Sequence, residues 1–361
     1  MYNPSRMAVA APVIKKVAIG LSGGVDSSVS AYLLMKDGYD VTGVHIKCWD
    51  SKGDGCTADQ DRADAVAVAT KLGIKFEGLD FVKEYKEKVI EYFYSEYTLG
   101  RTPNPDVLCN KEIKFGMFLE WAAGNGFDAV ATGHYARVVR NNSYTSLHQG
   151  VDASKDQSYF LYTLSQDQLS RALFPVGGMR KSEIRSIAKE LELVTATKPD
   201  SMGICFVGKV DIKDFLKNRL PEKPGDVINT KGQVIGCHDG AHFYTIGQRH
   251  GFEVTKYVGM PMYVLSKDIP NNILVVGSYE QAKRDSFEVE LLNQIKPDLT
   301  FPLKCLVRIR HLGELLECVV SKDSVTNNLT VSLQNKTFGV APGQSAVFYV
   351  GDEVTFGGVI L

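Results

Sequence analysis

The sequence predicts an α/β protein in which a doubly wound parallel sheet is followed by a small central β-rich domain and a C-terminal β-barrel. Up to about residue 207, short apolar runs alternate with stretches of helical periodicity, which is typical of a parallel sheet with crossover helices. From Val227 onward the pattern changes to short β-rich runs separated by turn residues. Because 361 residues also exceed the usual size of one hydrophobic core, we predict three domains, at residues 1–207, 208–276 and 277–361.

The spacing of apolar residues divides the first domain into strands and helices. Four runs of strand length are predicted to form the sheet: residues 15–21, 41–48, 75–81 and 127–132. Helical spacing predicts helices between and after them, at residues 25–33, 57–72, 85–93, 113–123 and 184–191. Thr57 and Gln60 have the spacing of a capping box at the start of the second helix.

The remainder of the chain shows almost no helical periodicity. Residues 211–219 are predicted to form a short helix ahead of the stretch PEKPGDV. Five strand candidates follow near the C-terminus: residues 305–311, 316–321, 329–334, 345–350 and 354–360. Five short strands are enough for a small barrel.

Composition places the chain among ordinary globular proteins, with 44% hydrophobic and 23% charged residues. No apolar run reaches the roughly 20 residues that a membrane-spanning helix needs. We therefore expect a cytoplasmic protein without a membrane partner, whose seven cysteines are mainly reduced and form disulfides only transiently. The net charge of -1 lacks the strongly basic balance of many nucleic-acid binders, so contacts with RNA phosphates would come from local patches.

Residues 20–28 (GLSGGVDSS) lie between a predicted strand and a predicted helix. Backbone N–H groups and a helix N-terminus form an anion site in this position, so we expect a nucleotide phosphate there. The loop lacks the lysine of a Walker A motif, and SGGxDS instead resembles the PP-loop of ATP pyrophosphatases, which release pyrophosphate and transfer AMP. We assign Ser22 and Ser27 to phosphate contact and Asp26 to Mg²⁺. The alternative is a glycine turn that merely joins strand to helix.

Two cysteines lie in settings that suit a reactive thiol. In the segment NPDVLCNK, Asp106 precedes Cys109 by three residues, and a helix is predicted to begin just afterwards. The helix N-terminus and the nearby Lys111 would both favour the thiolate. Cys205 lies in the glycine-containing segment PDSMGICF. The alternative is a buried structural cysteine, which is the interpretation that the sequence favours for the other five.

An ordered set of motifs resembles one family over nearly the whole chain. The motifs are GLSGGVDSS, GRTPNPDVLCNKEIKF, ATGHYAR, KDQSYFLYTLS, LFPVG, DSMGICF, TIGQR, NNILVV and PGQSAVFY. Together they resemble the tRNA-specific 2-thiouridylases, the MnmA/TrmU family of tRNA-uridine 2-sulfurtransferases. The PP-loop alone would not separate this family from its relatives.

The resemblance implies an ATP-dependent exchange of oxygen for sulfur on a tRNA uridine. ATP would lie on Gly20, Leu21, Ser22, Gly23, Gly24, Val25, Asp26 and Ser27, with its adenine side closed by Ile46 and Gly133. Attack of the uridine O2 on the α-phosphate would make AMP a leaving group. By the family pattern Cys205 receives sulfur as a persulfide from a donor protein or relay, Cys109 helps to deliver it and ends in a disulfide with Cys205, and Asp106 acts as general acid or base.

The resemblance also implies tRNA contacts in two parts of the chain. The wobble uridine of the anticodon loop would be flipped outward and held by Asn104, Pro105 and Asp106, with His134 beside it. The other implied tRNA contacts are Lys155, Asp156 and Gln157, and in the barrel Arg310, His311 and Gln344. Two local features differ among relatives: His311 stands where a tyrosine is expected, and Asp106, in place of a third cysteine, favours persulfide chemistry over an iron–sulfur cluster.

Two hypotheses compete with this one. Another PP-loop ligase would adenylate a small metabolite and would need neither Cys109 nor Cys205. An RNA-binding protein with a vestigial nucleotide loop would bind tRNA without releasing pyrophosphate. The sequence leaves the sulfur donor, the accepted tRNAs and the oligomeric state open.

Overall fold

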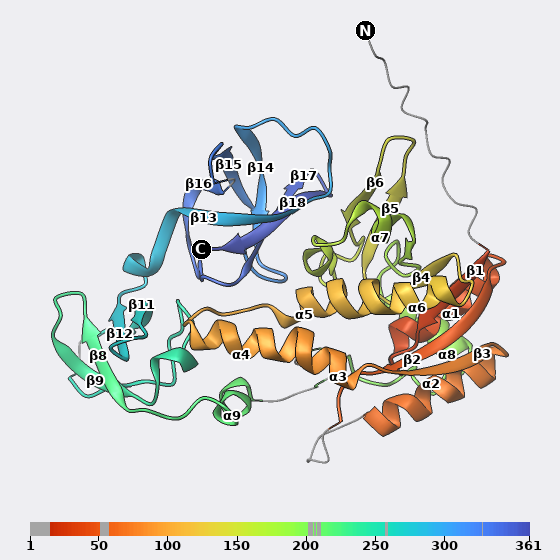
Figure 1. Cartoon of the computed structure of the whole chain (residues 1–361), viewed down its shortest axis with the longest axis horizontal. Coiled ribbons are helices and arrows are strands. Elements are labelled where there is room, and N and C mark those ends of the chain that lie inside the picture. Colours follow the sequence, from red (N-terminus) through yellow and green to blue (C-terminus); the bar gives the residue numbers. More distant parts are fainter. Residues whose placement is uncertain are drawn as a thin grey trace, which may run out of the picture.

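A computed structural model of the chain describes residues 15–50, 58–200, 205, 207, 211–256, 259–326 and 328–361. Its strands form a parallel sheet, a small central sheet and a barrel sheet. The parallel sheet and the central sheet lie at opposite ends of the long axis, and the barrel lies between them on one side (Figure 1). The predicted fold class, with a β-barrel at the C-terminus, is therefore confirmed.

The first sheet has five parallel strands in the order β3 (Lys75–Asp80), β2 (Asp40–Lys47), β1 (Lys16–Gly20), β4 (Ala129–Ala131) and β7 (Ala172–Leu173). The four predicted strands are confirmed, and the two-residue β7 was too short to be predicted. Val17, Ala18 and Ile19 of the central strand are fully buried, because helices cover both faces of the sheet. All five strands end at one edge.

Helices pack on the two faces of this sheet. Helix α1 (Val25–Lys36) and helix α2 (Ala58–Leu72) share a core with Val17 and Ile19, whereas α6 (Phe118–Gly124) shares a core with Ala18 on the opposite face. Helix α8 (Lys181–Glu190) packs on α1 through Ile184 and Ala188. Thr57, the predicted cap of α2, lies outside the described residues.

Two long helices, each built from consecutive segments, lie side by side between the parallel sheet and the central sheet (Figure 1). One consists of α3 (Val82–Tyr85), η1 (Lys86–Ile90) and α4 (Glu91–Thr98), and the other of α5 (Pro105–Leu108), η2 (Cys109–Met117) and α6. Both η1 and η2 are π-helical, a conformation that is frequent at functional sites. The second helix begins at Pro105 and not after Cys109, because proline suits the first helical position.

The central sheet has the order β10 (Glu253–Val254), β9 (Val234–His238), β8 (Gly225–Asn229), β12 (Ile273–Gly277) and β11 (Tyr263–Asp268). It is preceded by α9 (Ile212–Lys217), whose N-terminal backbone is capped by the Asp211 side chain, so the short predicted helix is confirmed. The remaining short helices are η3 (Ser158–Leu161), α7 (Gln166–Ser170), η4 (Ala241–Phe243) and η5 (Glu280–Ala282).

The C-terminal barrel is closed by six strands: β13 (Lys283–Gln294), β16 (Leu329–Phe338), β15 (Leu316–Lys322), β14 (Leu303–Arg308), β17 (Ser345–Val350) and β18 (Glu353–Ile360), with β13 also pairing with β18. Sequence patterns predicted five of them. The long β13 was missed because its run KRDSFEVELLNQ is largely polar and exposed. A hairpin from the first part of the chain, β5 (Ala136–Arg140) and β6 (Thr145–Gln149), extends this sheet by pairing with β18.

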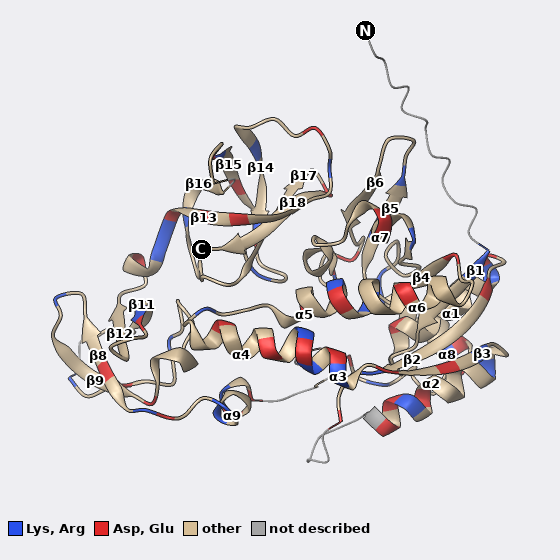
Figure 2. Cartoon of the chain, in the orientation of Figure 1, with Lys and Arg blue, Asp and Glu red and all other residues tan. Residues whose placement is uncertain are grey.

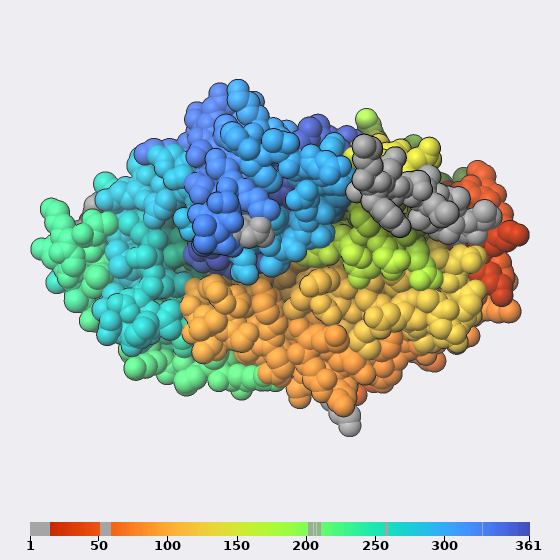
Figure 3. Space-filling view, turned by 45° about the horizontal axis from the view of Figure 1, so that its top comes forward, coloured from red at the N-terminus to blue at the C-terminus, as the bar shows by residue number. Residues whose placement is uncertain are grey.

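The barrel packs closely against the N-terminal part of the molecule (Figure 3). The Thr102 N–H donates to the Pro342 carbonyl over 2.8 Å, and Gln344 Nε2 donates to the Thr102 carbonyl over 2.8 Å. Arg308 Nη1 lies 2.6 Å from Asp156 Oδ2, and both side chains are almost completely buried. Arg308 therefore joins the barrel to the N-terminal part of the chain and does not belong to a solvated strand face.

Acidic and basic side chains are interleaved along the surface helices, as on α2 and along the long helix formed by α3, η1 and α4 (Figure 2). Within α2, Asp59, Asp61 and Asp64 alternate with Arg62 and Lys71. Among the described residues no helix is both long and apolar enough to cross a membrane.

Candidate active site at the carboxyl edge of the parallel sheet

The glycine-rich loop joins β1 to α1 as predicted. Helix α1 has Gly24 at its N-cap and no side-chain cap, so backbone N–H groups of its first turn are left for a ligand. The Ser22 and Ser27 hydroxyl oxygens lie 3.2 Å apart, and the Ser27 hydroxyl donates to the Gly24 carbonyl over 3.1 Å. Donors gathered in this way form a cradle of the size of a phosphate group.

Gly133, which follows β4, closes one side of this loop. A Cβ atom added at Gly133 would lie 2.7 Å from the Ser27 nitrogen and 2.8 Å from the Asp26 carbonyl carbon. The backbones of the two segments therefore touch, which is possible only without a side chain. Ile46 lies buried on β2, the neighbour of β1.

Replacing Gly133 by alanine is expected to weaken ATP binding about tenfold or more, because the new methyl group displaces the loop at a cost of about 1–3 kcal/mol. Gly124→Ala is the matched control, since a Cβ at Gly124 meets no atom within 4 Å. Calorimetric titration with ATP measures both variants. Equal affinity of the two would show that the contact between Gly133 and the loop has no bearing on the nucleotide.

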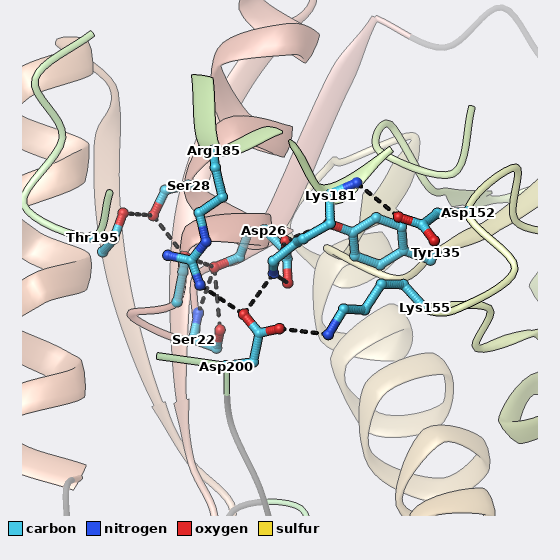
Figure 4. Close-up of polar contacts among 12 residues, drawn as sticks. Ser22, Asp26, Ser28, Tyr135, Asp152, Lys155, Lys181, Arg185, Thr195 and Asp200 are labelled. Carbon is cyan, nitrogen blue, oxygen red and sulfur yellow. Dashed lines mark hydrogen bonds and ion pairs between the residues drawn. The ribbon is translucent and has the colours of Figure 1, made fainter. Parts of the chain in front are cut away.

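Asp26 is held by a network of ionic contacts beside the loop (Figure 4). Lys181 Nζ lies 2.7 and 2.8 Å from its two carboxylate oxygens, and the Tyr135 hydroxyl donates to it over 2.7 Å. Lys181 also lies 2.8 Å from Asp200, which pairs in addition with Lys155 and Arg185, each over 2.7 Å. These cations hold the pKa of the Asp200 carboxyl well below its usual range, against the opposing effect of burial.

The ion pair with Lys181 concerns Asp26 as the predicted magnesium ligand. Asp26 is already neutralised by Lys181, and the described residues contain no group of three or more His, Cys, Asp or Glu side chains arranged to hold a metal ion. Mg²⁺ usually keeps waters and phosphate oxygens as ligands and takes only one or two carboxylates from a protein. A magnesium ion that arrives with the nucleotide would therefore take Asp26 as its carboxylate ligand only by displacing Lys181.

Cys109 and Cys205, 96 residues apart in sequence, meet in the interior. The Cys109 thiol donates to the Cys205 sulfur, with the two sulfur atoms 3.5 Å apart, and Cys109 is fully buried. Two contacts fix the Cys205 backbone: its N–H donates to Asp106 Oδ1 over 3.0 Å, and its carbonyl accepts from the buried Tyr85 hydroxyl over 2.6 Å. Cys109 and Cys205, which come from separate sequence motifs, thus form a dithiol, and Asp106 contacts the Cys205 backbone.

Electrostatics distinguishes the two thiols. Burial and the hydrogen bond to Cys205 raise the pKa of Cys109. The hydrogen bond from Cys109 lowers the pKa of Cys205; burial opposes this, and the charge of Lys114 lowers the pKa further. Burial also raises the pKa of Asp106, although the Cys205 N–H and Lys114 act in the opposite sense. The geometry therefore favours a thiolate at Cys205 and a thiol at Cys109.

His134 is a buried histidine next to the phosphate loop. It follows Gly133 directly, so its backbone adjoins the glycine-rich loop, and burial followed by the charge of Lys114 lowers its pKa. Its Nδ1 lies 2.6 Å from the Thr132 hydroxyl oxygen, and its ring packs against Phe115 and Phe174. A neutral, buried imidazole therefore directly follows the glycine that contacts the phosphate loop.

Two sequence interpretations of the sulfur site are corrected. Lys111 is exposed and pairs with Glu112, whereas Lys114, one further turn along η2, faces the two cysteines. Cys48 is buried directly after β2, and both burial and the charge of Cys205 raise its pKa, so it borders the dithiol. The helical register of residues 109–114 could not be read from the sequence, because a π-helical segment has no distinct pattern.

The predicted tRNA contacts fall into three groups. Asp156 has no exposed surface, since it pairs with Arg308 and accepts from the Gly150 and Ser158 N–H groups, so its predicted contact with tRNA is not supported. Arg310 is exposed beyond the end of β14. The other predicted residues contact neighbouring segments of the protein. Lys155 pairs with Asp200, and Gln157 accepts a hydrogen bond from the Tyr135 N–H. His311 packs on Phe160, Gln344 donates to the Thr102 carbonyl, and Asn104, which precedes Pro105, forms a hydrogen bond with Tyr159.

Three family descriptions match consecutive parts of the chain. They are the tRNA methyl transferase HUP domain at residues 15–209, the tRNA methyl transferase PRC-barrel domain at residues 213–278 and the aminomethyltransferase beta-barrel domain at residues 284–360. Among solved structures, the U34-tRNA thiolase NcsA from Methanococcus maripaludis with its [4Fe-4S] cluster is similar at 21% identity and a TM-score of 0.36, over 57% of this chain and 67% of that one.

Curated relatives are much closer. The tRNA-specific 2-thiouridylase MnmA of Blochmanniella pennsylvanica is 46% identical over 96% of this chain and 97% of its own length. The protein of the same name from Haemophilus ducreyi is also 46% identical, over 96% of this chain and 92% of its own length. The chain therefore belongs to the family of the tRNA-specific 2-thiouridylase MnmA.

Proposed function

We propose that the chain adenylates the C2 oxygen of the wobble uridine of tRNA with ATP and then replaces that oxygen with sulfur, giving 2-thiouridine, AMP and pyrophosphate. One observation carries the proposal: two thiols lie 3.5 Å apart, and Cys205 borders Cys48 directly after β2, at the carboxyl edge of the sheet that also carries the glycine-rich loop. A PP-loop ligase would have no use for the paired cysteines. The names of the curated relatives agree with this activity.

The nucleotide half of the site suits adenylation. The phosphates of ATP would lie on residues 20–27, with the adenine side closed by Ile46 and Gly133. The uridine O2 attacks the α-phosphorus, the bond to the β-phosphate oxygen breaks, and pyrophosphate leaves. Lys181 lies beside the loop but is paired with Asp26 and Asp200, so it would offer its charge to the phosphates only by leaving these carboxylates. Mg²⁺ on the phosphates would neutralise further charge on the leaving group.

The dithiol suits the sulfur step. With Cys205 carrying a persulfide, the terminal sulfur attacks C2 of the adenylated uridine and AMP leaves. The Cys109 thiolate then attacks the Cys205 sulfur, the S–S bond to the uridine sulfur breaks, and 2-thiouridine is released with a Cys109–Cys205 disulfide. An external thiol reduces this disulfide, which fits a reducing cytoplasm. Asp106, with its raised pKa, would exchange the protons of these steps.

The tRNA would enter from the barrel side. Asn104 and Pro105, at the start of the helix that leads to Cys109, would hold the flipped base together with His134, while Arg310 offers an exposed charge for the RNA backbone. Gln344 holds the backbone just before Asn104, so contact of tRNA with the barrel loop would bear directly on the base-binding segment. Lys155, Gln157 and His311 lie along the same junction of barrel and N-terminal domain.

Mass spectrometry of tRNA nucleosides tests the proposal. The reduced full chain is incubated with tRNA, ATP, Mg²⁺ and a persulfide donor, and 2-thiouridine is expected to form together with AMP and pyrophosphate. Release of pyrophosphate from ATP with a small metabolite as substrate, in the absence of tRNA, would favour another PP-loop ligase. Tight binding of tRNA without any release of pyrophosphate would favour a binding protein with a vestigial loop.

A further inference from the structure

Lys114 is a half-buried lysine on the π-helical segment η2, five residues after Cys109. In a π-helix each N–H group bonds the carbonyl five residues earlier, as the Phe118 N–H does with Ile113. Residues five apart therefore lie one above the other, whereas in an α-helix they would diverge. This register turns Lys114 toward the side of the helix that carries Cys109.

The surroundings of Cys205 come from four elements. Cys109 and Lys114 face it from η2, Asp106 from α5, Tyr85 from α3 and Cys48 from the end of β2. Apart from Lys114, every group in this set is either uncharged or acquires negative charge on ionisation. Burial by itself lowers the pKa of Lys114, but the charges of Cys205, Cys109 and Asp106 outweigh it and raise that pKa, so the side chain stays an ammonium group.

We propose that Lys114 selects Cys205 as the sulfur acceptor: its ammonium group stabilises negative charge on the Cys205 sulfur, first as the thiolate and then as the persulfide. The inference rests on the proposed function and names a residue for its first sulfur step. In that step the Cys205 thiolate attacks the outer sulfur of a donor persulfide, a new S–S bond forms at Cys205, the donor S–S bond breaks, and the donor leaves as a thiolate.

The hydrogen bond between the cysteines completes the selection. Cys109 donates its proton toward Cys205, which stabilises the acceptor and keeps Cys109 uncharged until the later step. A buried thiol without a nearby cation would stay protonated at neutral pH and would be inert toward the donor. The charge of Lys114 thus offsets the rise in the Cys205 pKa that burial causes.

The pH dependence of alkylation tests this role without tRNA or ATP. The reduced full chain is treated with iodoacetamide over a range of pH that spans the ordinary thiol pKa of about 8.5, and the modification of Cys205 is followed by peptide mass spectrometry. Lys114→Met is expected to raise the midpoint for Cys205 by about one pH unit or more, which slows alkylation at neutral pH about tenfold. Lys114→Arg is expected to restore most of the shift.

Lys111→Met is the matched control, because Lys111 is an exposed lysine on the same helix. It should leave the midpoint unchanged. If Lys114→Met does not fold, Lys114→Gln keeps a polar group of similar length and is measured in its place. An unchanged Cys205 midpoint in a folded Met or Gln variant overturns the inference. Failure of the proposed function is seen separately, as an absence of 2-thiouridine with the unmodified chain.

Discussion

Replacing Cys109 or Cys205 by serine is expected to lower the rate of 2-thiouridine formation about 1,000-fold or more. When catalytic groups act as a unit, loss of one group removes most of the rate enhancement that the whole unit provides. Serine keeps the size of the side chain but cannot form a persulfide or a disulfide at neutral pH. Pyrophosphate release that depends on tRNA should continue in both variants, because the phosphate loop is built from other residues. Nucleoside mass spectrometry and a pyrophosphate assay measure the two steps separately.

Cys237→Ser is the control for this experiment, because Cys237 is exposed and lies in the central sheet. It should form 2-thiouridine at the unmodified rate. The two catalytic variants should also differ from each other. Only Cys109→Ser keeps the acceptor sulfur, so with the sulfur donor but without tRNA it should carry a persulfide on Cys205, detectable as one added sulfur by intact mass. Full activity in either variant would contradict the dithiol mechanism.

The sequence predicted the parts of the site that depend on local patterns. An apolar strand followed by glycines and a helix places residues 20–27 at the sheet edge, and the structure has them there. The predictions for Cys109 and Cys205 came from separate segments, and their meeting depends on tertiary packing. That pairing came from the family resemblance and not from any property of the segments themselves.

The charged residues whose surroundings the sequence did not predict have one feature in common, which is burial. Lys114, Asp156, Arg308 and Lys181 are charged residues in polar segments, where exposure is the ordinary expectation. Each is instead buried or half-buried next to a group from a distant part of the chain. No periodicity in a single sequence shows which charged residues will find such partners. Lys181 beside the phosphate loop and Lys114 beside the two cysteines therefore became evident only in the folded chain.

Arg308→Met is expected to destabilise the protein by about 3–5 kcal/mol, because it leaves the fully buried Asp156 carboxylate without its cation. Methionine fills similar space, so the loss comes mainly from the charge. Arg310→Met, two residues along and exposed, should change stability by less than about 0.5 kcal/mol. Urea denaturation followed by circular dichroism compares the three proteins, and the Arg308 variant should unfold at a clearly lower midpoint.

A second substitution separates the ion pair from the packing around it. Combining Arg308→Met with Asp156→Asn removes both charges, and the neutral amide can still accept hydrogen bonds from the Gly150 and Ser158 N–H groups. Most of the lost stability should return in this double variant. Since this contact joins the barrel to the segment between Lys155 and Gln157, the single variant should also expose that segment to faster amide hydrogen exchange. Equal stability of the Arg308 and Arg310 variants would show that the buried pair does not hold the barrel in place.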